Sequence, residues 1–148
     1  MNNQHHELLR RGAEKLSLPI SDKQVDQLLQ FAELILKWNQ THNLTAITNP
    51  DEVVSKHLLD SLSICSSFPE GNALDVGSGA GLPGVPLAII NSHQNFTLVD
   101  CSLKRIAFIK EVKRKLALTN ITAVHSRIED FNDGEFDVIT SRAFSSLG

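Results

Sequence analysis

The sequence of 148 residues has only two cysteines, Cys65 and Cys101, with no CxxC spacing and no paired histidine pattern beside them. Neither a zinc site nor a disulfide framework is predicted, and no metal is expected. Long apolar runs are also missing, since a run such as residues 85–90 is far too short to cross a bilayer. The opening residues MNNQHHELLRR lack the apolar block of a signal peptide. These absences favour a cytoplasmic protein without membrane attachment.

An excess of positive charge is also missing from the chain as a whole. The formal net charge is −3, whereas a nucleic-acid-binding domain is commonly strongly basic. The positive charge is instead concentrated between residues 104 and 115, where six lysines and arginines face the single Glu111. Lys104 and Arg105 at the start of this segment are candidates for contact with RNA phosphates. The alternative is that the cations only solvate the outer face of a helix.

Residues 1–68 are predicted to form a helical cap that precedes a second region, residues 69–148. Ser21 and Gln24 have the spacing of a capping box, and apolar residues then recur at helical spacing up to Leu36. Asn49 followed by Pro50 predicts the start of another helix, over residues 49–67. A weaker helical pattern covers residues 6–16.

After residue 68 the pattern changes to short β-rich runs, at residues 73–77, 96–100, 121–126 and 136–141. Helical patterns over residues 83–93 and 103–118 separate the first three runs. This alternation predicts an α/β fold, a Rossmann-like domain with a parallel sheet. The fourth run is followed at once by the last residues, which would leave a sheet edge uncovered. The sequence therefore predicts either a chain truncated at its C-terminus, with further strands expected, or a partner that covers this edge.

The glycine-rich stretch LDVGSGAGLPG follows the first predicted strand and suggests a nucleotide against bare backbone. Gly77, Gly79 and Gly81 have GxGxG spacing rather than the GxGxxG spacing of a dinucleotide site. Asp75 would repel a pyrophosphate, and Pro83 and Pro86 remove donors from the first turn of the next helix. We therefore expect a ligand with a cationic end and no phosphate, which S-adenosylmethionine satisfies.

Three further positions extend this predicted cofactor site. Asp75 is expected to favour the amino acid end of the cofactor, or else to be a loop carboxylate held by backbone donors. Asp100 ends the second strand run and is expected to bind the ribose hydroxyls, with a helix cap as the alternative. Ile128 and Glu129 follow the third run, where they could flank the adenine.

Four ordered segments resemble a known family over most of the chain. They are residues 37–61, 74–89, 96–112 and the pair SRIEDF and VITSRAF. Together they are similar to the bacterial methyltransferases that modify guanine N7 in 16S ribosomal RNA, also called the glucose-inhibited division protein B family. The resemblance implies S-adenosylmethionine as the cofactor and 16S ribosomal RNA, or the small ribosomal subunit, as the partner. A monomer is expected.

Carried over by position, the resemblance implies that Gly77 and Leu82 contact the cofactor, that Ile128 and Glu129 hold its adenosine, and that Arg142 belongs to the site. His57 is a further candidate for RNA contact. Guanine N7 carries no proton, so attack on the methyl group requires no general base, and no catalytic residue is predicted. Two alternatives stay open: a methyltransferase for another RNA or a small molecule, and a cofactor-binding ribosome assembly factor without turnover.

Overall fold

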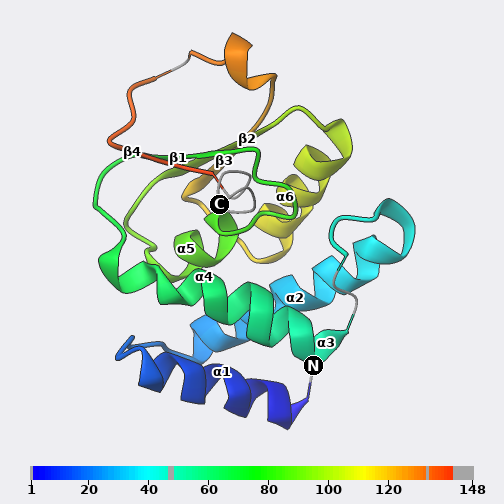
Figure 1. Cartoon of the computed structure of the whole chain (residues 1–148), viewed down its shortest axis with the longest axis vertical. Coiled ribbons are helices and arrows are strands. Elements are labelled where there is room, and N and C mark those ends of the chain that lie inside the picture. The colour runs from blue at the N-terminus through cyan, green and yellow to red at the C-terminus, as the bar shows by residue number, and fades with distance from the viewer. Residues whose placement is uncertain (1, 47–48, 133, 142–148) are drawn as a thin grey trace. The chain divides into compact units, whose positions relative to one another are not determined.

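The computed structural model describes residues 2–46, 49–132 and 134–141 of the chain. It divides into two compact units, Met1–Phe68 and Pro69–Gly148. The first is helical and the second contains the sheet (Figure 1). In the described part of the chain, no helix is both long and apolar enough for a membrane span.

The first unit contains the long helix α2 (Asp22–His42), which begins as its sequence predicts. The Ser21 hydroxyl accepts from the Gln24 N–H, and the Gln24 side chain accepts from the Ser21 N–H. These two bonds satisfy backbone donors that the first turn of a helix leaves free. The predicted apolar stripe is confirmed, because all its members except Leu36 are buried: Val25, Leu28, Leu29, Ala32 and Ile35.

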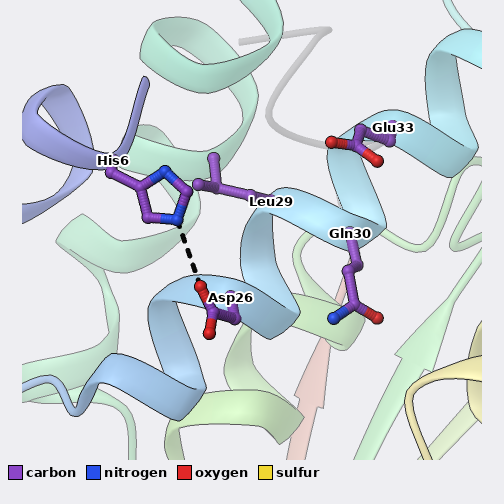
Figure 2. A pocket seen from close by; sticks show the side chains of 5 residues that line it. All are labelled: His6, Asp26, Leu29, Gln30 and Glu33. Atoms are coloured by element: carbon purple, nitrogen blue, oxygen red, sulfur yellow. Dashed lines mark hydrogen bonds and ion pairs between the residues drawn. The ribbon is translucent and has the colours of Figure 1, made fainter. Parts of the chain in front are cut away.

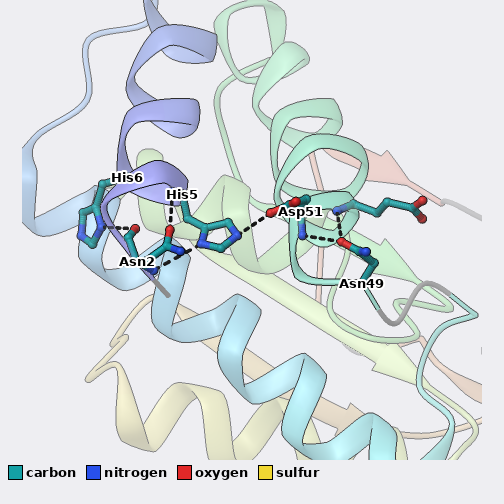
Figure 3. A network of polar contacts seen from close by, with 6 residues as sticks. Asn2, His5, His6, Asn49 and Asp51 are labelled. Atoms are coloured by element: carbon teal, nitrogen blue, oxygen red, sulfur yellow. Dashed lines mark hydrogen bonds and ion pairs between the residues drawn. The ribbon is translucent and has the colours of Figure 1, made fainter.

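Helix α1 (Asn3–Lys15) begins with a capping box that the sequence did not predict. The Asn2 side chain accepts from the His5 N–H, and His5 Nδ1 accepts from the Asn2 N–H, both at 3.2 Å. Because Nδ1 accepts, the ring proton lies on Nε2, which donates to Asp51 Oδ1 at 2.7 Å (Figure 3). Asn49 caps the Asp51 N–H in turn. One buried imidazole thus links two helix starts that are 46 residues apart.

The helix predicted over residues 49–67 is present but is not a regular α-helix. It begins as α3 (Pro50–Glu52), capped by Asn49 as predicted. It continues as the π-helix η1 (Val53–Leu58), α4 (Leu59–Ser63) and the 3-10 helix η2 (Cys65–Ser67). The Leu59 N–H donates to the Val54 carbonyl, five residues back. A wider turn places Val53, Val54, His57 and Leu58 in the buried interior of this unit.

The second unit contains four parallel strands, which confirms the predicted sheet. They are β1 (Ala73–Val76), β2 (Phe96–Asp100), β3 (Ile121–His125) and β4 (Val138–Thr140), in the order β3-β2-β1-β4. The chain moves from β1 to β2 on one side, whereas β4 pairs on the other. The strand order therefore reverses at β1, and ligands of open α/β sheets bind at the carboxyl ends of the strands beside such a reversal.

Two helices follow the first two strands. Helix α5 (Gly84–Ile90) is shorter than predicted, and the Asn120 side chain donates to the carbonyls of Ala88 and Asn91 at its end. Helix α6 (Leu103–Lys115) ends three residues earlier than predicted. Its predicted apolar stripe is buried, as are the inward residues of β2. This packing fixes where β1 and β2 end, and so positions the loops that follow them.

The His5 network generates a stability prediction. We expect His5→Ala to lower the free energy of unfolding by about 1–2 kcal/mol, because it removes both a helix cap and the bond to Asp51. The neighbouring His6→Ala is the matched control, since the His6 ring is more exposed and bonds only to exposed groups. It should change the unfolding free energy by less than about 0.5 kcal/mol. Urea unfolding compares the two variants, and equal losses would contradict this role for His5.

The two cysteines differ in environment, and this difference predicts a pH effect. Burial raises the pKa of the Cys65 thiol from 9.0 to about 12, whereas Cys101 is exposed. Between these values the unfolded chain ionises at Cys65 and the folded chain does not, so stability is lost as the pH rises through this window. Cys65→Ala should lose less unfolding free energy from pH 8 to pH 10 than the unaltered chain. Cys101→Ala should lose as much unfolding free energy over this pH range as the unaltered chain. An equal loss in the unaltered chain and in both variants would contradict the prediction.

Candidate functional site

The glycine loop lies between β1 and α5, at the carboxyl end of the sheet. Its three predicted glycines all have positive φ: +66° at Gly77, +58° at Gly79 and +85° at Gly81. The loop is fixed to the sheet because the Gly77 N–H donates to the Val99 carbonyl at 2.8 Å. A Cβ on Gly77 or Gly79 would meet no atom within 4 Å. These two glycines therefore have open space beside bare backbone, as the sequence-based hypothesis requires.

Asp100 lies at the end of β2 and is almost fully buried. One carboxylate oxygen accepts from the Gly79 N–H at 3.0 Å and the other accepts from the Ser102 N–H at 2.8 Å. The Arg105 guanidinium lies 3.8 Å from the same carboxylate. The alternative of a helix cap is wrong, because Ser102 is the N-cap of α6. Asp100 instead joins the end of β2 to the middle of the glycine loop.

Asp75 does not point into open space. Its side chain is fully buried, and Oδ2 accepts from the Gly84 N–H at the start of α5, at 3.0 Å. This arrangement is the alternative that the sequence left open, a carboxylate held by a backbone donor. A Cβ on Gly84 would lie 2.6 Å from Asp75 Oδ2 and 3.0 Å from the Leu98 side chain. Gly84 is therefore the residue that lets α5 approach the strands.

The first turn of α5 has few donors left for an anion. The Gly84 N–H is taken by Asp75, the Val85 N–H donates to the Gly81 carbonyl, and Pro83 and Pro86 have no N–H. A pyrophosphate needs free backbone N–H groups at this point of the fold and meets a carboxylate instead. The local geometry thus opposes a dinucleotide, for the reason that the sequence indicated.

Apolar side chains extend the site along the sheet edge. Ile128 and Glu129 lie in the 3-10 helix η3 (Ile128–Asp130) after β3, and Ile128 is 48% exposed. Leu103, at the start of α6, is 66% exposed. Because Asp100 and His125 are register partners, the segments that follow β2 and β3 both leave from this edge. The sequence did not single out Leu103, although a large apolar residue soon after an acidic strand end was the available signal.

The remaining predicted residues differ in their outcomes. Leu82 is buried in the glycine loop, and its N–H donates to the Ser78 carbonyl. Lys104 is exposed on α6. Arg142 lies outside the described residues, so its role stays a prediction. The prediction for His57 is wrong: the residue is only 6% exposed, and Nε2 lies 2.9 Å from the Thr45 hydroxyl, so it offers no surface for RNA.

A separate hollow of about 180 Å³ lies in the first unit. It is lined by His6 and, from α2, by Asp26, Leu29, Gln30 and Glu33 (Figure 2). His6 Nε2 lies 3.1 Å from Asp26 Oδ1. In the part of the chain that is described, no group of three or more histidine, cysteine or acidic side chains could hold a metal ion.

The chain is similar in sequence to one family of enzymes. The family described as GidB, rRNA small subunit methyltransferase G, matches residues 24–148. The ribosomal RNA small subunit methyltransferase G of Stutzerimonas stutzeri (strain A1501) is 50% identical, over 99% of this chain and 70% of the relative. The same enzyme of Actinobacillus pleuropneumoniae serotype 5b (strain L20) is 47% identical, over 94% of this chain and 68% of the relative.

Solved structures of more distant proteins have a similar fold. A coclaurine N-methyltransferase bound to N-methylheliamine and SAH superposes with a TM-score of 0.53 at 18% identity, over 92% of this chain and 50% of that one. The SAH-bound Podospora anserina methyltransferase PaMTH1 superposes with a TM-score of 0.54 at 18% identity, over 95% and 58%. At this identity the likeness concerns the fold.

The contact between Asp75 and Gly84 can be tested by a double-mutant cycle. Gly84→Ala should lower the free energy of unfolding by about 1–3 kcal/mol, because the new methyl group collides with Asp75 and Leu98. In an Asp75→Ala background the same substitution should cost less, since one of the colliding atoms is gone. Urea unfolding measures the four proteins. Additive losses would contradict direct coupling between these residues.

Proposed function

Because the chain belongs to the rRNA small subunit methyltransferase G family, we propose that it transfers a methyl group from S-adenosylmethionine to N7 of a guanine in 16S ribosomal RNA. One observation carries this proposal: the 50% identity extends over 99% of the chain and 70% of the relative, and so includes both units.

The described residues fit S-adenosylmethionine. The open space at Gly77 and Gly79 admits a ligand against the backbone, and the Ser78 hydroxyl is buried with no hydrogen-bond partner among the described residues. Asp100 would accept from the ribose hydroxyls. Ile128 and Leu103 would cover the adenine faces, and Glu129 would lie near its amino group. Leu82 and Gly81 shape the loop, and Arg142 is proposed to complete the site.

Asp75 has a different role in this proposal from the one first expected. Its Oδ2 already accepts from Gly84 N–H, so we assign it to positioning the loop and the start of α5. By accepting from the Gly84 N–H, Asp75 also takes a backbone donor that a phosphate would need at the start of α5. The same contact therefore positions the loop and disfavours a ligand with phosphates.

Methyl transfer to guanine N7 requires the protein mainly to position the two reactants. When bound, S-adenosylmethionine would supply a methyl group on a sulfonium sulfur. Its transfer to the guanine N7 lone pair would leave a neutral thioether and give the positive charge to the purine. No proton is removed, so the task of these residues is to hold N7, methyl carbon and sulfur in line. A cytoplasmic location, a monomeric state and RNA contact by Lys104 and Arg105 belong to the same proposal.

The reaction is tested directly by methyl transfer. Incubation of the protein with methyl-labelled S-adenosylmethionine and small ribosomal subunits that lack the modification should label the RNA, and digestion should release 7-methylguanosine. Labelling of a different RNA, or of a different position on the base, would contradict the proposal. Cofactor binding without any transfer would favour an assembly factor instead.

The cofactor site can be tested by replacing one of two exposed isoleucines of the second unit, Ile128 at the site and Ile139 away from it. Ile128→Ala should weaken binding of S-adenosylhomocysteine roughly tenfold, equivalent to about 1.4 kcal/mol, because it removes apolar contact area. Ile139→Ala is the matched control, since Ile139 is 67% exposed but lies within β4, opposite Leu74. Calorimetric titration should show unchanged affinity for this control. Equal affinities for both variants, or protection of the fold by NAD rather than by S-adenosylhomocysteine, would contradict the assignment.

A further inference from the structure

The basic segment that the sequence singled out lies in α6, which begins after β2 (Figure 1). One face of this helix is apolar and packs into the second unit, with four residues at 0–1% exposure: Ile106, Phe108, Ile109 and Val112. This packing fixes which side chains face outward. Lys104, Lys110 and Lys115 are exposed, whereas Lys113 is half-buried and lies about half a turn around the helix from Lys104. We call the three exposed residues the α6 lysines.

The α6 lysines differ from the two arginines of the helix in their partners. Arg114 pairs with Glu111, and Arg105 lies 3.8 Å from Asp100. Within residues 2–46, 49–132 and 134–141, no carboxylate lies within 4 Å of an α6 lysine. Three exposed ammonium groups thus lie along one helix, none of them paired with a carboxylate of the described residues. A helix that only needed solubility would gain more from mixed charges, as in Glu-Lys pairs one turn apart.

The positive charge of α6 contrasts with the negative charge of the rest of the chain. Outside residues 104–115 there remain 8 lysines and arginines against 16 aspartates and glutamates, which gives a formal charge of −8. Exposed charges are screened beyond about 8 Å at physiological salt, so a polyanion responds to the local charge rather than to the net charge. A polyanion would therefore be attracted to α6 although the chain as a whole is acidic.

The position of α6 connects this face to the proposed site. The helix begins three residues after Asp100, at the carboxyl edge of the strands where the glycine loop lies. Lys104 is in its first turn, and Lys115 lies eleven residues on, roughly 17 Å along the helix axis. A strand of nucleic acid held along these lysines would have one end at the edge where Ile128 and Leu103 are exposed.

We infer that the α6 lysines form a docking surface for the phosphates of the substrate RNA and hold the strand beside the target guanine. The inference rests on the proposed function for the identity of the RNA, and it adds the surface that binds it. The contact is to phosphates rather than bases, because ammonium groups on flexible stems act as point charges without the planar geometry that reads a base edge.

The test compares two triple variants that remove the same charge. Lys104→Gln/Lys110→Gln/Lys115→Gln removes the exposed α6 lysines, and Lys15→Gln/Lys23→Gln/Lys37→Gln removes three exposed lysines of the first unit. Binding of naked 16S ribosomal RNA is measured between 50 and 300 mM salt. The α6 variant should bind roughly 10–100-fold more weakly at 100 mM salt, and its slope of log affinity against log salt should fall by roughly 2. The first-unit variant should bind within about threefold of the unaltered chain.

Three controls make each outcome decisive. Thermal unfolding and S-adenosylhomocysteine affinity should be unchanged in the α6 variant, and methyl transfer at saturating RNA should retain its kcat while the KM for RNA rises. Equal losses in both variants would show an effect of net charge and overturn the inference. The inference would also be overturned if the α6 variant lost affinity for whole subunits but not for naked RNA, because that result would indicate a ribosomal protein as the partner.

The two proposals fail in different ways. Methyl transfer by the unaltered chain, with RNA affinity unchanged in the α6 variant, would overturn this inference and the proposed RNA contact by Lys104, but would leave the proposed methyl transfer to guanine N7 intact. Salt-dependent binding through α6 with no methyl transfer by the unaltered chain would overturn the proposed function.

Discussion

The hydrogen bond from the Gly84 N–H to the Asp75 carboxylate, at 3.0 Å, is the contact on which the site depends. It joins the end of β1 to the first residue of α5, across the whole glycine loop. The helix can come this close only because Gly84 has no Cβ. With both ends of the loop fixed, the three glycines are held in backbone conformations that other residues rarely adopt. The same carboxylate takes up the Gly84 N–H, a backbone donor that a phosphate at the start of α5 would need.

Asp100 provides the second anchor, and it differs from Asp75 in what surrounds it. Both carboxylates are buried and both accept from a backbone N–H of the loop region. Asp75 lies under α5, whereas Asp100 lies at the strand end beside Gly79, where open space begins. Two acidic residues 25 positions apart thus hold the loop at different points, Asp75 through the Gly84 N–H and Asp100 through the Gly79 N–H.

Much of the fold could be predicted from the sequence because its signals are local. The Ser21 and Gln24 capping box, the Asn49 cap and the four strand runs depend on neighbouring residues and on hydrophobic period. The π-helical turn has no such local signal, and the burial of His57 involves a contact with Thr45, twelve residues away. The direction of Asp75 could be predicted only as one of two alternatives, since both a ligand and a backbone donor suit a carboxylate.

The chemistry proposed for this site explains why the sequence predicts no catalytic acid or base. Attack by an unprotonated ring nitrogen on a sulfonium methyl group requires alignment, and alignment is provided by backbone and by apolar contact rather than by titrating side chains. Selectivity must then come from where the RNA is held. In a chain whose residues outside 104–115 sum to −8, we propose that the lysines of α6 supply the local attraction for RNA. The position of that helix, immediately after Asp100, couples substrate docking to the cofactor edge through the fold itself.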